Sequence, residues 1–363
     1  MLRGAARIAV LLPACLALAA CAGPGYYFQA ASGQLKLMRA RQDVAQVLAD
    51  PQTDPALAAR LQTAQDILDY AGHKLGMPAD GSYSSFVRTG QPAVVWNVIA
   101  APEFSLDARK WCFPVAGCVP YRGYFDERKA REFAGRMRSR GFDVSVQGAT
   151  AYSTLGWFSD PLLDTMLQGD DARLAGTLFH ELAHQRLYVK GDTGFSEAYA
   201  SFVEAAGVRL WLTENRQDAF LEDWVRAQQA VAQFRQLQAQ TRDRLQALYR
   251  SGWAVTEMRA AKHGIFDDMS AEYEMLVTRE WGDRNYFAGW MREHRNNAAL
   301  ALYREYHQGF CAFEALFEQA GSDFRNFHRL AEEKAGLRAE QRAEWLYDNC
   351  ETGEAAIAPA GDL

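Results

Sequence analysis

The pattern of apolar and polar positions predicts helices over most of this chain. Asp54-Pro55 combines a capping residue with a proline suited to a first helical turn, so a helix is expected to begin there. One face of that helix then carries four apolar residues: Leu57, Leu61, Ala64 and Leu68. The segment 34–48 is expected to form a neighbouring helix.

The helical pattern is strongest after residue 210. The segment 215–250 is expected to be one long, charged and Gln-rich helix, and 272–327 continues the helical region. One face of the long helix carries apolar residues at helical spacing: Trp224, Ala227, Val231, Phe234, Leu245 and Leu248. Only Gln238 and Thr241 interrupt this stripe, so one face can pack while the other meets solvent.

Between these regions the pattern changes to that of strands. Residues 93–100 and 121–125 are expected to be extended, and 127–140 to be helical. Residues 142–151 alternate in polarity, as in a strand with one buried face, and 151–158 continue that strand. A small sheet is therefore expected ahead of the helix that follows.

That helix carries the motif on which the functional interpretation rests. Asp170-Asp171 can cap it, and 172–189 contains no Pro and only one Gly, Gly176. Its apolar stripe comprises Leu174, Ala175, Leu178, Phe179, Leu182 and Ala183. Two histidines and a glutamate in so apolar a helix suggest a specific role.

These residues form the motif His180-Glu181-Leu182-Ala183-His184, an H-E-x-x-H. Residues four apart lie on one face of a helix, so both imidazoles can bind a single metal ion. Glu181 can then act as general base on a metal-bound water. The motif is typical of zinc hydrolases and predicts Zn²⁺ as the cofactor.

A catalytic zinc site needs a third protein ligand and keeps one position for water. The metzincin pattern would supply a third histidine, but Lys190 occupies its place and Leu187 stands where that pattern has glycine. A glutamate from the next helix is therefore expected. After a turn at 191–194, the segment 195–204 is predicted to be that helix.

Two glutamates of this next helix compete for the third position. Glu197 is preferred, because the small residues Ala198 and Ala200 let its helix approach the H-E-x-x-H helix closely. Glu204 is the alternative ligand, at the longer separation usual in thermolysin-like enzymes. Whichever glutamate does not bind the metal is expected to hold a histidine N–H, because metal-bound histidines need such a partner.

Several stretches of the chain carry a wider likeness. They are 94–98, 101–106, 111–118, 121–125, 151–158, 179–185, 187–193 and 195–197. Together they resemble the bacterial predicted aminopeptidase family of zinc-dependent lipoproteins over most of the mature chain. The resemblance implies a gluzincin-type metallopeptidase with His180, His184 and Glu197 as ligands and Glu181 as general base. One position departs from the family pattern, since Ser196 stands where Asn is expected.

We therefore expect a zinc metallopeptidase that acts on peptides, and the resemblance favours an aminopeptidase. A zinc endopeptidase and a non-catalytic, zinc-stabilised envelope scaffold are the alternatives. The intact Glu181 argues against the scaffold, because metal binding alone does not require a base at that position.

Other residues are candidates for substrate contacts. The segment 151–154, just before the metal helix, can pair with an extended peptide as a sheet edge. Tyr188, Tyr306 and His307 are candidate donors to the developing oxyanion. If the enzyme trims N-termini, Glu103 is the candidate acid for binding the substrate ammonium.

The N-terminus predicts export from the cytoplasm. Arg3 and Arg7 precede an apolar run at 8–20, as in a signal peptide. The run ends in Leu-Ala-Ala-Cys, which resembles a lipobox and makes Cys21 the expected lipidation site; an ordinary secretory signal is the alternative. Ala22 resembles the residue that follows the cysteine in lipoproteins of the outer membrane. We expect a lipid-anchored protein on the periplasmic face of the envelope.

Cysteine usage fits that compartment. Of six cysteines, Cys15 leaves with the signal and Cys21 is acylated, which leaves four. This even number, Cys112, Cys118, Cys311 and Cys350, suits an oxidising periplasm. The short spacing favours a Cys112–Cys118 bridge and leaves Cys311–Cys350, although the sequence also permits the other two pairings. A thiolate metal site is disfavoured, since there is no C-x-x-C spacing.

Charge narrows the range of partners. Removing the two positive charges of Arg3 and Arg7 from the net charge of −6 leaves −8 for the mature chain. The sequence has no basic stripe interleaved with aromatic residues, so nucleic acid is not an expected partner. The oligomeric state does not follow from the sequence.

These features predict an α+β, predominantly helical protein. Its zincin-like catalytic core has a small sheet ahead of the H-E-x-x-H helix, and a helical C-terminal region packs on that core. The expected organisation is a signal peptide at 1–20, an N-terminal helical segment at 21–75, the core at 76–211, the helical region at 212–354 and a flexible tail at 355–363.

Overall fold

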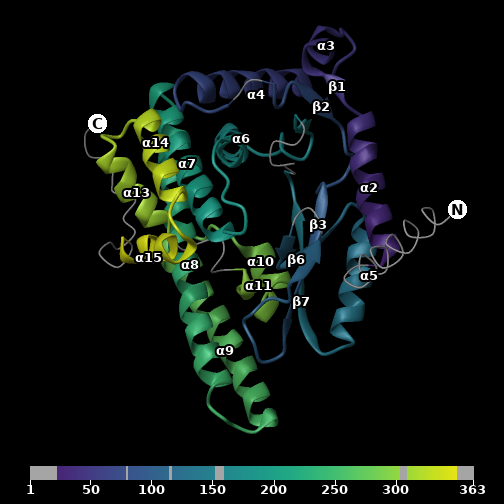
Figure 1. Cartoon of the computed structure of the whole chain (residues 1–363), viewed down its shortest axis with the longest axis vertical. Helices are drawn as coiled ribbons and strands as arrows, with labels where there is room; N and C mark the ends of the chain where they lie inside the picture. Colours follow the sequence, from purple (N-terminus) through teal and green to yellow (C-terminus); the bar gives the residue numbers. More distant parts are fainter. Residues whose placement is uncertain (1–22, 79–80, 114–116, 152–158, 303–308, 350–363) are drawn as a thin grey trace, which may run out of the picture.

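The computed structural model describes residues 23–78, 81–113, 117–151, 159–302 and 309–349. The helices are α2 (Pro24–Arg39), α3 (Val44–Ala49), α4 (Pro55–His73), α5 (Glu127–Arg138), α6 (Asp171–Arg186), α7 (Thr193–Glu214), α8 (Asp218–Tyr249), α9 (Val255–Met275), the π-helical turn η1 (Leu276–Glu280), α10 (Ala288–Glu293), α11 (Asn297–Ala301), α13 (Phe310–Gln319), α14 (Phe324–Ala335) and α15 (Ala339–Asp348). The strands are β1 (Gln42–Asp43), β2 (Ser85–Val87), β3 (Val95–Pro102), β4 (Trp111–Phe113), β5 (Gly117–Val119), β6 (Tyr121–Tyr124), β7 (Phe142–Ala149) and β8 (Leu162–Leu163). The predicted class, mainly helical with small sheets, is confirmed (Figure 1).

Two predicted helical segments are divided in the structure. Within 34–48, α2 ends at Arg39, and Asp43 starts α3 by accepting hydrogen bonds from the backbone N–H groups of Ala45 and Gln46. A capping side chain here favours a new helix over continuation of the old one. The segment 272–327 is likewise several helices, and Gly282, with a φ of 57°, lies just after η1, where the chain leaves helical geometry.

The larger sheet has the antiparallel order β6-β3-β7, with β3 in the centre. Alternate side chains of β3 point to opposite faces, as the pleat requires. Val98 and Ala100 pack with the α5 side, while Ile99 and Ala101 pack with α11 (Figure 1). Because helices cover both faces, β3 is apolar along nearly its whole length.

A second sheet ties the N-terminal part of the chain to the segment that enters α6. Its order is β1-β2-β8, and β2 runs parallel to β8 with Phe86 opposite Leu162. Just ahead of this pair, the backbone N–H of Tyr83 donates to the carbonyl of Asp160 at 2.7 Å. The neighbouring Ser82 also donates to Gln185, so this part of the chain is held beside α6.

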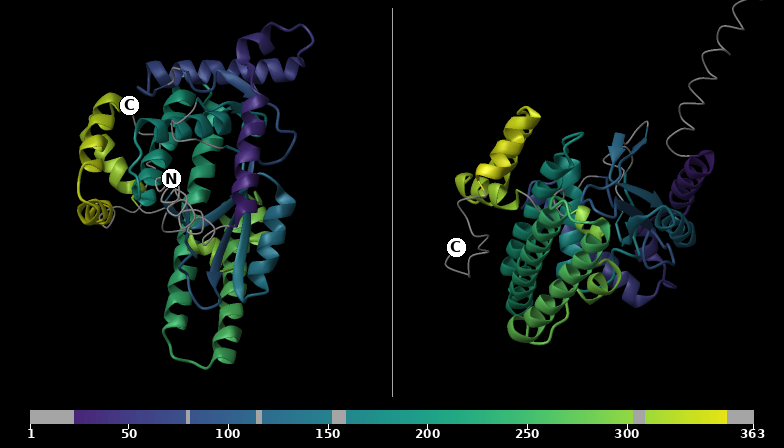
Figure 2. Two further views of the ribbon diagram at one scale, coloured as in Figure 1. Left: turned by 45° about the vertical axis from the view of Figure 1, so that its right-hand side comes forward. Right: turned by 90° about the horizontal axis from the view of Figure 1, so that it is seen from below.

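Helices α8 and α9 form a long antiparallel hairpin that extends from one end of the molecule (Figures 1 and 2). Gln238 and Thr241, the two polar residues expected within its apolar face, are buried together with that face. Thr241 can be buried because its hydroxyl donates to the carbonyl of Leu237 at 2.8 Å, inside its own helix.

The C-terminal helices α13, α14 and α15 pack against the region around α7 (Figure 2). Aromatic rings contribute to this contact: Phe195 and Phe313 lie 5.1 Å apart between centroids, and Phe202 and Phe327 lie 5.0 Å apart. Rings at this separation bury large apolar areas and stabilise the interface. The expected packing of the C-terminal helices on the core is present, whereas the domain boundaries stay predictions.

The cysteines agree with the expected local bridge. A disulfide joins Cys112 of β4 to Cys118 of β5. Cys311 is disulfide-bonded, and Cys350, its expected partner, lies outside the described residues, as does Cys21. Among the described residues, no helix has the length and apolar character needed to span a bilayer.

A buried histidine links α14 to α7 and to the end of α4. His328 is 1% exposed; its Nδ1 lies 2.8 Å from the Tyr199 hydroxyl, and its Nε2 lies 2.7 Å from the Leu75 carbonyl. A neutral imidazole satisfies both partners by donating through Nε2 and accepting at Nδ1. Burial lowers the pKa of His328 to about 4, although its hydrogen bond with Leu75 acts in the opposite direction.

This histidine predicts a pH dependence of stability. In the unfolded chain its pKa is about 6.5, so between that value and about 4 the unfolded state binds a proton that the folded state does not. The free energy of unfolding should therefore fall by about 2 kcal/mol between pH 7 and pH 5. Urea unfolding at both pH values measures this free energy. His328→Gln should flatten this dependence and the exposed-site control His73→Gln should not; an unchanged slope in His328→Gln would contradict the assignment.

Candidate metal centre

Helix α6 presents the H-E-x-x-H residues and ends soon after them. It ends at Arg186, three residues before the predicted end, because Leu187 is extended with a φ of −145°. After a turn, Asp192 caps α7 by accepting from the backbone N–H of Phe195. The Ser196 hydroxyl, in the position that departs from the family pattern, accepts from the Val189 N–H at 3.1 Å and so fastens the connection.

Glycines allow α6 and α7 to lie close together. A Cβ atom on Gly176 would stand 3.2 Å from the Glu204 carboxylate, and one on Gly207 would stand 2.9 Å from the ring of Phe179. Ala198 borders Gly309, the residue before α13, and the expectation that Ala198 and Ala200 allow the approach of the two helices stays a prediction. The glycine in the middle of α6 is a contact point with α7.

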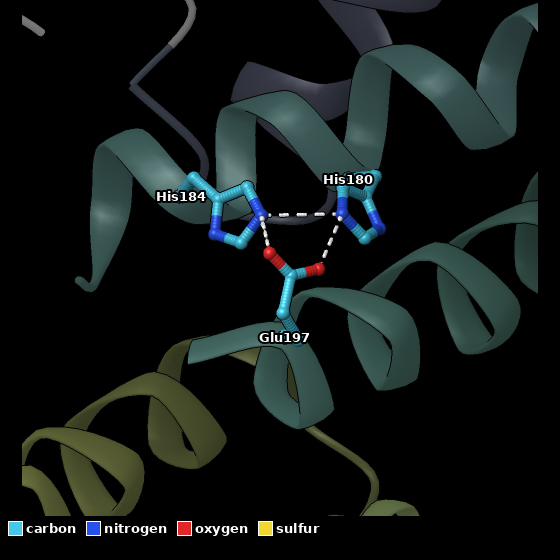
Figure 3. Close-up of side chains that lie close together, drawn as sticks. All are labelled: His180, His184 and Glu197. Atoms are coloured by element: carbon cyan, nitrogen blue, oxygen red, sulfur yellow. Dashed lines mark hydrogen bonds and ion pairs between the residues drawn. The ribbon is translucent and has the colours of Figure 1, made fainter. Parts of the chain in front are cut away.

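Three side chains from α6 and α7 converge on one point (Figure 3). His180 Nε2 lies 3.2 Å from His184 Nε2 and 3.4 Å from Glu197 Oε2, and His184 Nε2 lies 3.5 Å from Glu197 Oε1. Ligands about 2.0–2.1 Å from a tetrahedral zinc ion are separated from one another by about 3.3 Å. The spacing of these atoms therefore fits a small tetrahedral cation.

Glu204 lies behind this group. Its Oε2 is 3.0 Å from Nδ1 of His180, on the side of the ring that faces away from Glu197. A carboxylate only accepts, so Nδ1 carries a hydrogen, and in the neutral ring the lone pair of Nε2 then points toward the centre. The structure thus places Glu197 with the histidine Nε2 atoms and Glu204 as the partner of a histidine N–H, the arrangement that metal-bound histidines use.

The electrostatics of the group favour a cation. Burial lowers the pKa of His180, but hydrogen bonds with Glu197 and Glu204 outweigh burial and raise the pKa well above its ordinary value. Burial raises the pKa of Glu197, yet hydrogen bonds with His180 and His184 bring it down to about 2. The two imidazoles and the carboxylate therefore attract positive charge, which a proton or a metal ion can supply.

Glu181 lies on the same helix between the two histidines. Burial raises the pKa of Glu181, while the charges of His180 and His184 lower it and those of Glu197 and Asp160 raise it further. Its side chain therefore sits within the electrostatic reach of the candidate metal ligands.

Two residues near Glu181 were missed by the sequence analysis. Burial, followed by the charges of Glu181 and Asp160, raises the pKa of Tyr83 well above its ordinary value. Tyr83 is 2% exposed and has a φ of 62°, which is uncommon for a bulky residue, and Asp160 is 1% exposed. The neighbouring Ser82 hydroxyl donates to the Gln185 side chain of α6 at 2.9 Å. The sequence does not show that Tyr83 and Asp160 lie near Glu181, because a parallel strand pair brings their distant segments to α6.

The other candidate residues are distributed differently. The ring of Tyr188 lies 6.2 Å from that of His184, and the side chain is 40% exposed, so it borders the centre. Glu103 is not with this group, because both of its carboxylate oxygens accept from Arg259 of α9. That ion pair gives Glu103 a structural partner in place of the proposed substrate ammonium. Tyr306, His307 and most of the 151–158 segment lie outside the described residues.

The fold and this centre define an α+β protein, mainly helical, with a candidate metal site on an H-E-x-x-H helix and the helix after it. The chain matches over residues 25–346 the family model described as "Putative aminopeptidase", and it belongs to that family. Searches of curated proteins and of solved structures gave no match.

The two glutamates of α7 should differ in their effect on metal affinity. Glu197→Ala removes a candidate ligand, so it should nearly abolish Zn²⁺ binding. Glu204→Ala removes only the partner of His180 Nδ1, which should weaken binding by about 10- to 100-fold. Glu214→Ala, at the other end of the same helix, is the matched control and should bind like the parent. Competition with a chromogenic chelator measures all four proteins; equal losses in Glu197→Ala and Glu204→Ala would contradict the placement.

Proposed function

We propose that this protein is a zinc metallopeptidase of the bacterial cell envelope that removes residues from the N-termini of peptides. The observation that carries the proposal is the convergence of His180, His184 and Glu197 at tetrahedral spacing, with Glu181 on the same helix as the histidines. Membership of an aminopeptidase family supports the choice of reaction and substrate.

The donor set supports zinc. Two imidazole nitrogens and one carboxylate form a His₂Glu set, which catalytic zinc sites use while keeping a fourth position for water. Imidazole suits zinc, whereas magnesium and calcium prefer oxygen ligands alone. His180, His184 and Glu197 would hold the ion, and Glu204 would fix the ring orientation of His180.

When bound, zinc supplies Lewis acidity toward a carbonyl and lowers the pKa of water to about 7. Glu181 is suited to take the proton from that water and to return it to the leaving amine, because burial has raised its pKa. Tyr188, at the edge of the centre, is our choice for the donor to the oxyanion. Burial and the charge of Glu197 raise the pKa of Tyr188, so its hydroxyl keeps the proton that it would donate.

The proposed location follows from the N-terminus and the cysteines. A lipid at Cys21 would hold the protein on the periplasmic face of the envelope, and the residues around this cysteine support an outer-membrane address. The Cys112–Cys118 disulfide supports an oxidising compartment.

Replacing the proposed base separates catalysis from metal binding. Glu181→Gln keeps the size of the side chain but removes the proton acceptor, so kcat on a peptide substrate should fall by about 10²- to 10⁴-fold. Zinc content should stay at the parent level. Glu314→Gln, a partly buried glutamate of α13 whose pKa burial also raises, is the matched control and should retain activity. Parental turnover in Glu181→Gln would refute the assigned mechanism.

Blocked peptides distinguish the two kinds of peptidase. An aminopeptidase must recognise the free ammonium group, so a peptide with a free N-terminus should lose single residues one after another. The same peptide with an acetylated N-terminus should not be hydrolysed. Mass spectrometry of timed digests, with and without chelator, records the products. Identical internal cuts in both peptides would identify an endopeptidase instead.

A further inference from the structure

Helix α2 is fixed to the body of the protein along one face. The side-chain amide of Gln29 donates to the Gly123 carbonyl of β6 and accepts from the backbone N–H of Phe125. One turn further, Gly33 meets the ring of Phe125 so closely that a Cβ atom at this position would overlap it. Tyr26 packs against Phe113 and Tyr124 beside them. The orientation of α2 about its own axis is therefore set by its inner face.

The outer face of α2 is an apolar stripe that the other described residues leave exposed. It consists of Phe28, Ala31, Leu35 and Met38, which recur three and four positions apart and so share one side of the helix. Phe28 is 75% exposed, Leu35 is 45% exposed and Met38 is 37% exposed. Three large apolar side chains aligned along one helix indicate a surface that meets an apolar partner.

The charges of α2 select the kind of partner. The helix contains Lys36 and Arg39 but no acidic residue, although the whole chain is net negative. Neither basic side chain forms an ion pair with another described residue, and both are exposed. A helix with an exposed apolar stripe and uncompensated basic residues has the character of one that lies in the interface of an anionic membrane.

The position of α2 in the chain points to the same partner. The helix begins at Pro24, three residues after Cys21, the proposed lipidation site. A chain of three residues spans at most about 10 Å, so an acyl group on Cys21 would keep the first turn of α2 at the lipid surface. A stripe that continues along the helix from that point can then contact the same surface.

We propose that α2 is a membrane-contact helix, which lies along an anionic phospholipid surface with Phe28, Leu35 and Met38 immersed at the boundary of the acyl chains and Lys36 and Arg39 near the headgroups. The rigid attachment of its inner face to β6 then sets how the rest of the protein stands on the membrane. The surface binds lipid without help from an acyl chain, and this inference is independent of the catalytic proposal.

The test uses the chain from residue 21 onward with Cys21→Ser, which contains every described residue and carries no lipid. Flotation with vesicles of phosphatidylcholine, with and without phosphatidylglycerol, measures the partition coefficient. The unlipidated protein should bind the vesicles that contain phosphatidylglycerol. Phe28→Ser combined with Leu35→Ser should lower partitioning by about tenfold or more. Lys36→Gln combined with Arg39→Gln should lower it by about tenfold, and high salt should remove this second difference.

The control pair is Phe220→Ser with Tyr347→Ser, two side chains that are 55% and 63% exposed on α8 and α15. These helices lie across the molecule from α2 (Figures 1 and 2), so the control should partition like the parent. An unchanged thermal unfolding transition shows that each variant is folded. The proposal is overturned if the parent stays unbound at low salt, or if the control loses as much binding as the α2 variants. It is also overturned if light scattering shows an α2-dependent dimer that does not bind vesicles.

Discussion

The close approach of α6 and α7 is the constraint on which the rest of this structure depends. It holds two imidazole nitrogens and a carboxylate at about the edge length of a small tetrahedron, the separation that a zinc ion imposes. Gly176 and Gly207 allow this approach, because any side chain at either position would touch the opposite helix. Asp192 and Ser196 stabilise the turn between the helices by hydrogen bonds to backbone N–H groups. Glu197 of α7 therefore lies beside the two histidines of α6.

The surrounding structure supports this helix pair from several sides. Aromatic residues of the C-terminal helices pack against α7, and the buried His328 joins α14 to α7 by a hydrogen bond. On the other side, the β1-β2-β8 sheet brings Tyr83 and Asp160 near Glu181. Burial raises the pKa of Glu181, and the charge of Asp160 adds to this effect. Groups of this kind are costly to bury without partners, so their concentration around one helix makes this place the candidate functional site.

The sequence predicted the local parts of this centre and missed the distant ones. The histidine pair follows from helical periodicity, and Glu197 lies near the start of the next helix along the chain, so both could be expected without a structure. Tyr83 and Asp160 reach the centre through a parallel strand pair, which no local period reveals. The division of the 34–48 segment has a local cause, because Asp43 caps a new helix where a continuous one was expected. The burial of Thr241 depends on another local hydrogen bond, which its hydroxyl donates within its own helix.

Zinc K-edge X-ray absorption on the purified protein tests the central claim most directly, because it reports which atoms surround the ion. The arrangement of His180, His184 and Glu197 predicts nitrogen and oxygen neighbours at about 2.0–2.1 Å, outer-shell scattering from two imidazole rings, and no sulfur at about 2.3 Å. The scattering from imidazole should fall by half in His184→Ala. A sulfur neighbour, a shell without imidazole, or a protein that takes up no zinc would contradict the account.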